Sequence, residues 1–259
     1  MTGLAETLRK SWVVTVLTIR YLLSTKRGLA TLALSWIPLL LVASLALARV
    51  ASFDILLFQA LMVPLFLPIV LVFVTLVDAT ALIREEIDDN TLPFLLTRPV
   101  SKPFLAVSKY AGYLVAALVL LLPPVLVSYA VTEAYAGTAL GTDADVLTGF
   151  LAATALAVLA YGALFFFLSV ALRKPLFVGL LIGFVWESVV GSLPGSVPKL
   201  SLIYYLRSVL KGTIGVGPLS GFATDVSASV AAAILVAFAV VMVVLATFLF
   251  QSMEFRQKA

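Results

Sequence analysis

The stretch REEIDDNTLPFLLTRPVSKP, residues 84–103, places acids, bases and prolines between two long apolar runs. Each Asp, Lys or Arg at the centre of a bilayer costs about 2.5–3.5 kcal/mol. Burying the charged side chains of this stretch in lipid would therefore cost roughly 15–25 kcal/mol in sum. We expect residues 84–103 to lie in water or against another protein, and the runs on either side to cross a membrane.

The composition of the whole chain agrees with a membrane protein. Of its 259 residues, 63% are hydrophobic and 12% are charged, about half the charged share of a soluble domain. The sequence holds no Cys and no His, which excludes disulfides, Cys/His zinc or haem sites, a Cys nucleophile and a Ser-His pair. Ser/Lys and Asp/Asp pairs are also missing from the apolar runs, so an intramembrane enzyme is disfavoured.

Six apolar runs predict the fold class, an all-α polytopic membrane protein with one transmembrane domain over residues 1–259. A span needs about 20 apolar residues to cross roughly 30 Å of hydrocarbon. Five runs meet this length, and a sixth is shorter and carries Glu187 near its end. The runs are residues 29–48, 55–83, 104–129, 147–172, 176–190 and 226–250.

The basic residues predict the orientation of these spans. With the N-terminus in the cytoplasm, most of the 17 Lys and Arg residues fall on the inner side, as the positive-inside rule requires. The loop with Glu133, Asp143 and Asp145 then lies outside. The basic residues predicted to lie outside are Arg49, Lys199, Arg207 and Lys211. We therefore expect a multi-pass protein of the cell membrane with both termini cytoplasmic, and the net charge of +4 concerns orientation rather than nucleic acid.

Two further segments do not read as spans. Residues 1–27 show an apolar side opposite a charged side at helical spacing, which predicts an amphipathic interfacial helix; an ordinary first turn of a spanning helix is the alternative. Residues 191–225 are broken by Gly and Pro, and hold a brief amphipathic helix with Ser201 as its expected N-cap. We interpret residues 191–225 as an outer-face, partly re-entrant segment, and a plain outer loop stays equally open.

The charged stretch itself predicts a short cytoplasmic helix. Asp88, Asp89 and Asn90 end the preceding helix, since Asn tolerates the left-handed conformation common at helix C-termini. Pro93 suits a first helical turn, and the residue before Pro99 avoids helical geometry. The result is an apolar helix of about two turns in a charged loop. Exposed apolar clusters mark partner surfaces, although this one could instead tuck into the protein's own core.

The segment EEIDDNTLPFLLTRPVSKPFLAVSKY, residues 85–110, resembles the signature of the permeases of ABC transporters, in the ABC type-2 exporter family. The shared features are an acidic pair, a small-residue turn, Thr-Leu, an apolar patch, a Thr-Arg-Pro-Val-Ser segment and a later Lys. The resemblance extends over nearly the whole chain, from the amphipathic N-terminal helix to the broken outer segment. One position departs from the family, because Asn90 stands where Gly is more frequent, which puts the geometry of that turn in doubt.

The resemblance implies that residues 84–103 form the coupling helix that docks into a groove of a separate ATPase subunit. The apolar face would dock, and the carboxylates would meet basic groups of the partner or of neighbouring helices. Carried over by position, the docking residues are Glu85, Glu86, Asp88, Asp89, Asn90, Thr91, Leu92, Phe94, Leu95, Leu96 and Arg98.

The chain has no phosphate-binding loop of the form GxxxxGK[ST], so ATP hydrolysis is expected in a partner and not in this chain. The resemblance implies two copies of that ATPase, which would bind ATP and magnesium, and a second permease subunit in a homodimer or heterodimer. The chain itself is expected to bind no cofactor and no metal. The alternative is a self-sufficient secondary transporter or channel, but an internal repeat and charges deep in several spans are not found.

Asp78 and Glu187 are the acids inside predicted spans, and both are candidates for a gating or path role. We place both near a membrane interface, where solvation is cheap. Small residues at Gly179, Gly183 and along 153–162 suit either a subunit interface or packing inside one subunit. Prolines at positions 38, 64, 68, 123 and 124 predict kinks.

Overall fold

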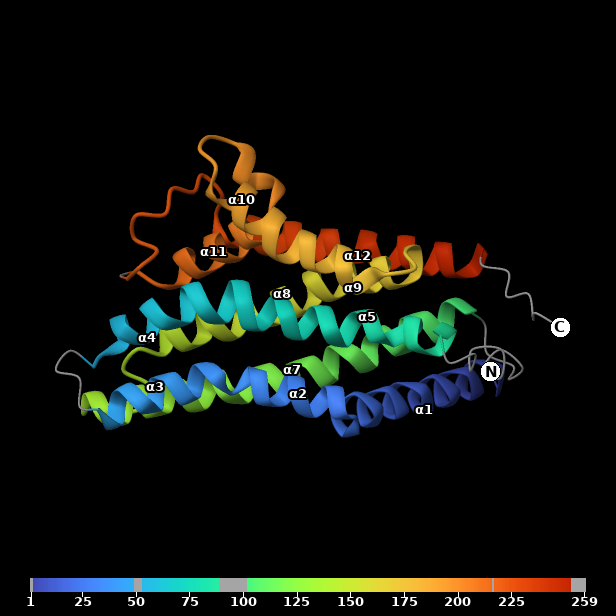
Figure 1. Ribbon diagram of the computed structural model, residues 1–259, viewed down its shortest axis with the longest axis horizontal. Coiled ribbons are helices and arrows are strands. Elements are labelled where there is room, and N and C mark those ends of the chain that lie inside the picture. Colours follow the sequence, from blue (N-terminus) through green and yellow to red (C-terminus); the bar gives the residue numbers. More distant parts are fainter. Residues whose placement is uncertain (1, 49–52, 89–101, 216, 253–259) are drawn as a thin grey trace.

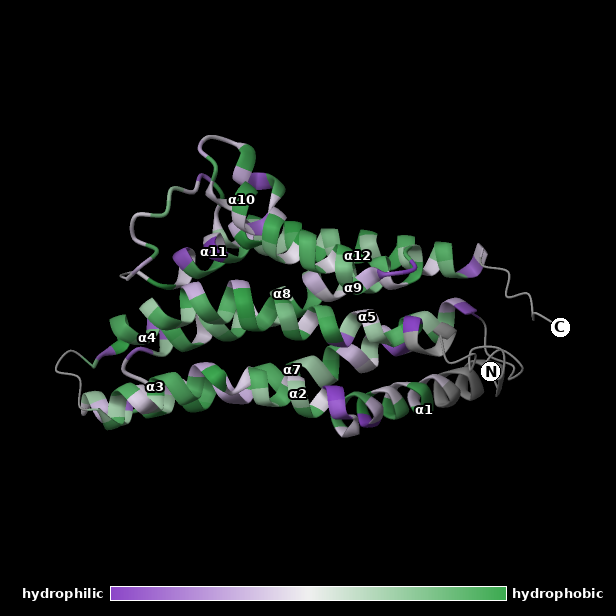
Figure 2. Ribbon diagram, viewed as in Figure 1, coloured by the Kyte–Doolittle hydropathy of each residue, from purple (hydrophilic) through white to green (hydrophobic). Residues whose placement is uncertain are grey.

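The computed structural model describes residues 2–48, 53–88, 102–215 and 217–252, and of residues 2–10 and 85–88 it describes the backbone alone. Over these residues the chain forms an elongated bundle whose long helices run along one axis (Figure 1). Apolar residues dominate the middle of most helices, and polar residues gather around α10, α11 and the end of α5 (Figure 2).

The described elements are all helical. In chain order they are α1 Thr2–Ser24, α2 Lys26–Ser35, α3 Ile37–Leu47, α4 Ile55–Leu61, η1 Met62–Leu71, α5 Val72–Asp88, α7 Lys102–Ala136, α8 Ala144–Ala171, α9 Pro175–Leu180, η2 Leu181–Trp186, α10 Glu187–Ser192, η3 Val197–Leu200, α11 Leu202–Thr213 and α12 Ala228–Ser252.

Six helical stretches within the described residues are long and apolar enough to cross a membrane, which confirms the predicted fold class. The third stretch extends several residues beyond the predicted end, to Ala136. The fifth, the shortest, is also present. The stretches are Lys26–Leu47, Ile55–Arg84, Lys102–Ala136, Ala144–Ala171, Pro175–Ser192 and Ala228–Ser252.

The junction between α1 and α2 is a tight break in the helix. Thr25 has extended backbone angles, φ −79° and ψ 159°, and its hydroxyl accepts the N–H of Gly28 at 3.3 Å, which caps α2. A Cβ atom on Gly28 would collide with the carbonyl of Leu22. Only glycine therefore fits at the place where the chain turns from α1 into the first span.

Helix α1 packs along α7. Thr15 Oγ1 donates to the carbonyl of Ser108 at 3.1 Å, and a Cβ on Gly112 would lie 2.8 Å from Cβ of Thr18, so glycine allows the close approach of the two helices. Trp12 is 69% exposed on the other side of α1, where it is free to meet lipid. That residues 1–27 lie in the membrane interface stays a prediction.

Helix α8 is the centre of the bundle and contacts α5, α7, α11 and α12. Its small residues Ala153, Ala157 and Gly162 are buried inside the chain, and a Cβ on Gly162 would collide with the ring of Tyr113 from α7. The small residues along 153–162 therefore serve packing within one subunit.

The prolines act differently in the second and third spans. Pro64 and Pro68 lie in η1, a π-helical segment, because a proline lacks the N–H that an α-helical turn needs. Pro123 and Pro124 lie inside α7, and the α-helix continues through both. The kinks predicted from the sequence at Pro123 and Pro124 stay a prediction.

The acidic group predicted in the outer loop is partly inside a helix. Glu133 lies in the last turns of α7, is 1% exposed, and accepts the backbone N–H of Asp143 at 3.3 Å. The prediction that Glu133 lies in the loop was therefore wrong, because the residue belongs to α7. Its carboxylate ties the end of α7 to the start of α8. Burial and the neighbouring carboxylates of Glu133, Asp145 and Asp54 raise the pKa of Asp143.

Candidate functional site

The predicted docking residues lie at or beyond the limit of the described chain. Asp89, Asn90, Thr91, Leu92, Phe94, Leu95, Leu96 and Arg98 lie outside the described residues. Glu85, Glu86 and Asp88 belong to the final turn of α5, where only the backbone is described. The docking role of these residues stays a prediction.

Lysine side chains join the helices that flank this stretch. Lys109 of α7 is 6% exposed, and its Nζ donates to the carbonyl of Leu82 in α5 at 2.8 Å. Lys102 Nζ, at the start of α7, donates to the carbonyl of Gln251 near the end of α12 at 3.4 Å. The end of α5 and the start of α7 thus lie at the same end of the bundle as the beginning of α1 and the end of α12 (Figure 1).

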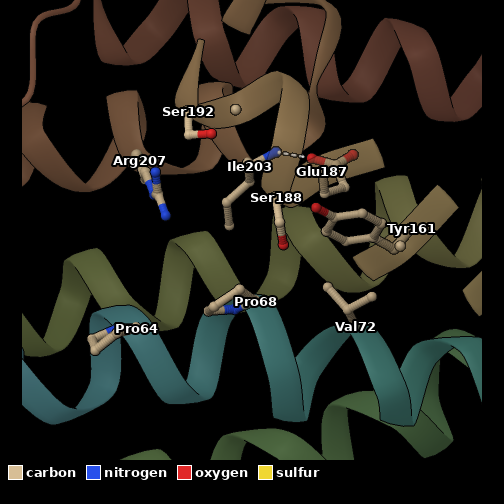
Figure 3. Close-up of a pocket in the computed structure, with 11 residues that line it drawn as sticks. Pro64, Pro68, Val72, Tyr161, Glu187, Ser188, Ser192, Ile203 and Arg207 are labelled. Carbon is tan, nitrogen blue, oxygen red and sulfur yellow. Dashed lines mark hydrogen bonds between the residues drawn. The ribbon is translucent and has the colours of Figure 1, made fainter. Parts of the chain in front are cut away.

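A cavity of about 210 Å³ lies toward the opposite end of the bundle, between the second and fifth spans and α11. Pro64, Pro68 and Val72 form one wall, and Tyr161 of α8 closes another (Figure 3). The remaining lining comes from Gly183 of η2 and from α10 and α11, including Glu187 and Arg207.

Two π-helical segments, η1 and η2, lie in contact beside this cavity. A Cβ on Gly183 of η2 would lie 2.7 Å from Cγ1 of Val72, and one on Gly179 would collide with Leu76. The absence of side chains at these glycines lets the fifth span approach the second. Both glycines therefore pack within the subunit, one of the two roles that the sequence left open. Single widened π turns occur often at functional sites.

Glu187 is fixed by the N-terminus of α11. It is 5% exposed, and its Oε1 and Oε2 accept the backbone N–H groups of Leu202 and Ile203, each at 3.0 Å. Helix N-termini leave such N–H groups without intrahelical partners and favour negative charge. Placing Glu187 at a solvated interface was wrong, since it is a buried cap for α11.

The expected cap of α11, Ser201, has the right position and extended geometry but makes no side-chain cap bond. Its hydroxyl instead donates to the carbonyl of Pro198 at 2.7 Å. The carboxylate of Glu187, 15 residues before Leu202, takes its place. Residues 202–213 form the predicted amphipathic helix, while re-entry of 191–225 into the membrane stays a prediction.

Arg207 and Tyr161 complete the polar lining, and the sequence did not single out either of them. Arg207 lies on α11, and its guanidinium points toward the space between α11 and η1 (Figure 3). Among the described residues, neither Arg207 Nε nor Tyr161 Oη, both buried, makes a hydrogen bond of good geometry. Burial lowers the pKa of Arg207, against the opposing effect of nearby Tyr161 and Glu187. Only the folded chain brings these residues together, so no local motif signals them.

Asp78 lies elsewhere, near the C-terminal end of the second span. It is 2% exposed, with the side chain of Thr31 beside its carboxyl. Its Oδ2 is buried without a hydrogen bond among the described residues. Asp78 is therefore not at a solvated interface as expected, and it does not line the cavity that holds Glu187.

Comparison with known proteins identifies the chain by family. No curated protein sequence matches it. The family described as ABC-2 family transporter protein matches residues 13–190, which include the first four spans and nearly all of the fifth. Together with six apolar helices, this match makes the chain a multi-pass membrane protein of the permease type that works with an ATPase partner. The chain belongs to the ABC-2 family of transporters.

Proposed function

We propose that this chain is the permease subunit of an ATP-driven exporter, and that residues 84–103 dock its ATPase subunit. The family match carries the proposal. The position of the stretch supports it, since α5 and α7 are joined at one end of the bundle by Lys109. An apolar cluster between charged neighbours suits a protein partner better than lipid.

The assembly we propose contains two permease subunits, identical or different, and two ATPase subunits in the cell membrane. ATP and magnesium bind to the ATPase subunits, and this chain hydrolyses nothing. Both termini lie in the cytoplasm with the docking stretch. The distribution of Lys and Arg along the sequence supports this orientation.

The test is co-purification of the ATPase subunit with the tagged chain from native membranes. Phe94→Asp combined with Leu95→Asp places two charges in the apolar docking face. Buried unpaired charges of this kind cost several kcal/mol, so we expect association to fall by more than about tenfold.

A matched control is Leu140→Asp, which makes the same kind of change in the connection between α7 and α8, where Leu140 is 73% exposed. We expect this control to retain the ATPase. Equal association of the double variant, the control and the unchanged chain would refute docking through residues 84–103. Transport by the purified chain with no partner would instead favour the secondary transporter.

A further inference from the structure

The cavity beside α11 lies apart from the helix ends that flank the predicted docking stretch. It lies toward the end of the bundle away from α1's beginning, and its walls come from the second, fourth and fifth spans and α11 (Figures 1 and 3). A volume of about 210 Å³ has room for several water molecules or for one compact charged group, since a water occupies about 30 Å³.

Arg207 brings a positive charge to the lining of this cavity. The side chain is partly buried, and its Nε atom is fully buried and lacks a hydrogen bond among the described residues. A buried N–H donor without an acceptor is unfavourable, and guanidinium groups match the paired oxygens of carboxylates and phosphates in shape. An anion in the cavity would satisfy Arg207.

Glu187 does not fill that role, although it lines the same cavity. Both of its oxygens already accept backbone N–H groups of α11 at 3.0 Å. Within the described chain, Glu187 and Arg207 form no ion pair, whereas Lys199 and Asp225 of the same end of the bundle do. The protein thus positions its carboxylate on the helix end and leaves the guanidinium toward the cavity.

The remaining lining suits a molecule that is partly apolar. Pro64, Pro68 and Val72 present hydrocarbon to the cavity, while Ser188 offers a hydroxyl donor from the opposite wall (Figure 3). The hydroxyl of Ser192, which also lines the cavity, donates to the carbonyl of Val189 at 3.0 Å. Ser188 is exposed, so the cavity is open at that side. Mostly apolar walls with a few convergent polar groups are typical of small-molecule sites.

We propose that this cavity binds the anionic headgroup of an amphipathic molecule, with Arg207 as its charge partner and Ser188 as a hydrogen-bond donor. The headgroup is a phosphate or a carboxylate, and the apolar part follows the wall formed by η1. As a binding site the cavity is independent of ATPase docking. That the bound molecule is the cargo of the exporter rests on the proposed function.

The test measures binding to the purified full chain in neutral dodecyl maltoside by isothermal titration calorimetry. The probes share one alkyl chain: dodecyl phosphate, dodecylphosphocholine and dodecyltrimethylammonium, with inorganic phosphate as the headgroup alone. We expect dodecyl phosphate to bind most tightly and the cation least. Arg207→Gln removes charge-assisted hydrogen bonds and should weaken dodecyl phosphate by about tenfold or more, while Arg207→Lys retains part of the affinity.

The matched control is Arg173→Gln, which removes the same charge from an exposed position in the α8–α9 connection and should leave affinity unchanged. Ser188→Leu fills the open side without replacing a buried residue, so it tests the cavity even if Arg207→Gln fails to fold. We expect it to abolish binding while thermal unfolding without probe stays the same.

Equal affinity in Arg207→Gln and the unchanged chain, or tighter binding of the cation, would overturn the anion site. Inorganic phosphate binding as tightly as dodecyl phosphate would overturn the amphipathic class of ligand. Because the assay uses the permease alone, these results are independent of ATPase co-purification, so failure of the cavity and failure of docking are distinguishable.

Discussion

The second and the fifth span each bury one carboxyl, Asp78 and Glu187, and the two carboxyls have opposite surroundings. Glu187 accepts two backbone N–H groups at 3.0 Å and thereby closes the N-terminus of α11. Asp78 has Thr31 beside it, but its Oδ2 has no hydrogen bond among the described residues. The Glu187 carboxyl thus caps a helix, whereas one oxygen of the Asp78 carboxyl has no hydrogen-bond donor among the described residues.

This difference separates a structural acid from a functional candidate. Buried polar groups are nearly always hydrogen-bonded, so an exception calls for an explanation beyond folding. Acids inside membrane spans are likewise functional candidates by default. On this criterion the gating or path role proposed for both acids suits Asp78 better than Glu187, whose position is explained by α11.

Removing the Glu187 carboxylate should have the largest effect on stability. Glu187→Ala leaves the N–H groups of Leu202 and Ile203 buried without acceptors, at about 1–3 kcal/mol each. We expect a loss of about 2–4 kcal/mol in the free energy of unfolding, measured by denaturant titration in detergent. Glu187→Gln, which keeps one acceptor oxygen, should lose less. Equal stability of all three chains would show that the cap contributes nothing.

Widening the contact between the second and fifth spans should have the next largest effect. A Cβ on Gly183 would lie 2.7 Å from Val72 Cγ1 and 3.3 Å from Phe165 Cζ, so Gly183→Ala should cost about 1–3 kcal/mol through overpacking. Gly221→Ala is the matched control, since nothing lies within 4 Å of a Cβ there. The comparison is made by thermal unfolding, and equal losses in both variants would exclude a packing role for Gly183.

Neutralising Asp78 should not cause the loss of stability that is expected for Glu187→Ala. Asp78→Asn keeps the shape and removes a buried group that lacks one partner, so we expect stability to stay within about 1 kcal/mol or to rise. If Asp78 serves gating, ATP-driven transport should fall in the same variant. A destabilisation as large as that of Glu187→Ala would show that the Asp78 carboxylate is fully satisfied in the folded chain.

The smallest effect concerns the exposed ion pair between Lys199 and Asp225. Lys199 Nζ lies 2.6 Å from Asp225 Oδ2, and this bond lowers the pKa of Asp225 below its usual value of 3.8. A depressed carboxyl pKa stabilises the fold above pH 3.8, and that contribution is lost as the pH falls through the lower folded value. Asp225→Asn should therefore make the free energy of unfolding depend less on pH below pH 4 and change it little at pH 7. The same pH dependence in the variant and the unchanged chain would show that the pair is open in solution.

Six spans could be predicted from the sequence because each is a continuous apolar run, and lipid demands that pattern. The site could be predicted only in part. Glu187 was conspicuous as an acid in an apolar run, but its partners lie 15 and 16 residues further along, beyond any local cap motif. Ser201, the local candidate, bonds to Pro198 instead.

Arg207 illustrates the same limit. It reads as one cation among several in a polar outer segment, and only the packing of α11 against α8 and α12 places it at a cavity (Figure 3). The effect of the prolines on helix geometry was similarly ambiguous in the sequence. Pro64 and Pro68 lie in a π-helical segment, whereas Pro123 and Pro124 leave α7 continuous. Tertiary contacts, which the sequence does not display, decide between these outcomes.

The most direct test of the account is the ATPase rate of the complex in proteoliposomes, made with the ATPase subunit that co-purifies with the chain. We expect no hydrolysis by the chain alone and a higher ATPase rate when the permease is added to the ATPase. The double substitution Phe94→Asp and Leu95→Asp should abolish this increase. An increase that survives the double substitution, or hydrolysis by the chain alone, would contradict docking through residues 84–103 and an ATPase in the partner.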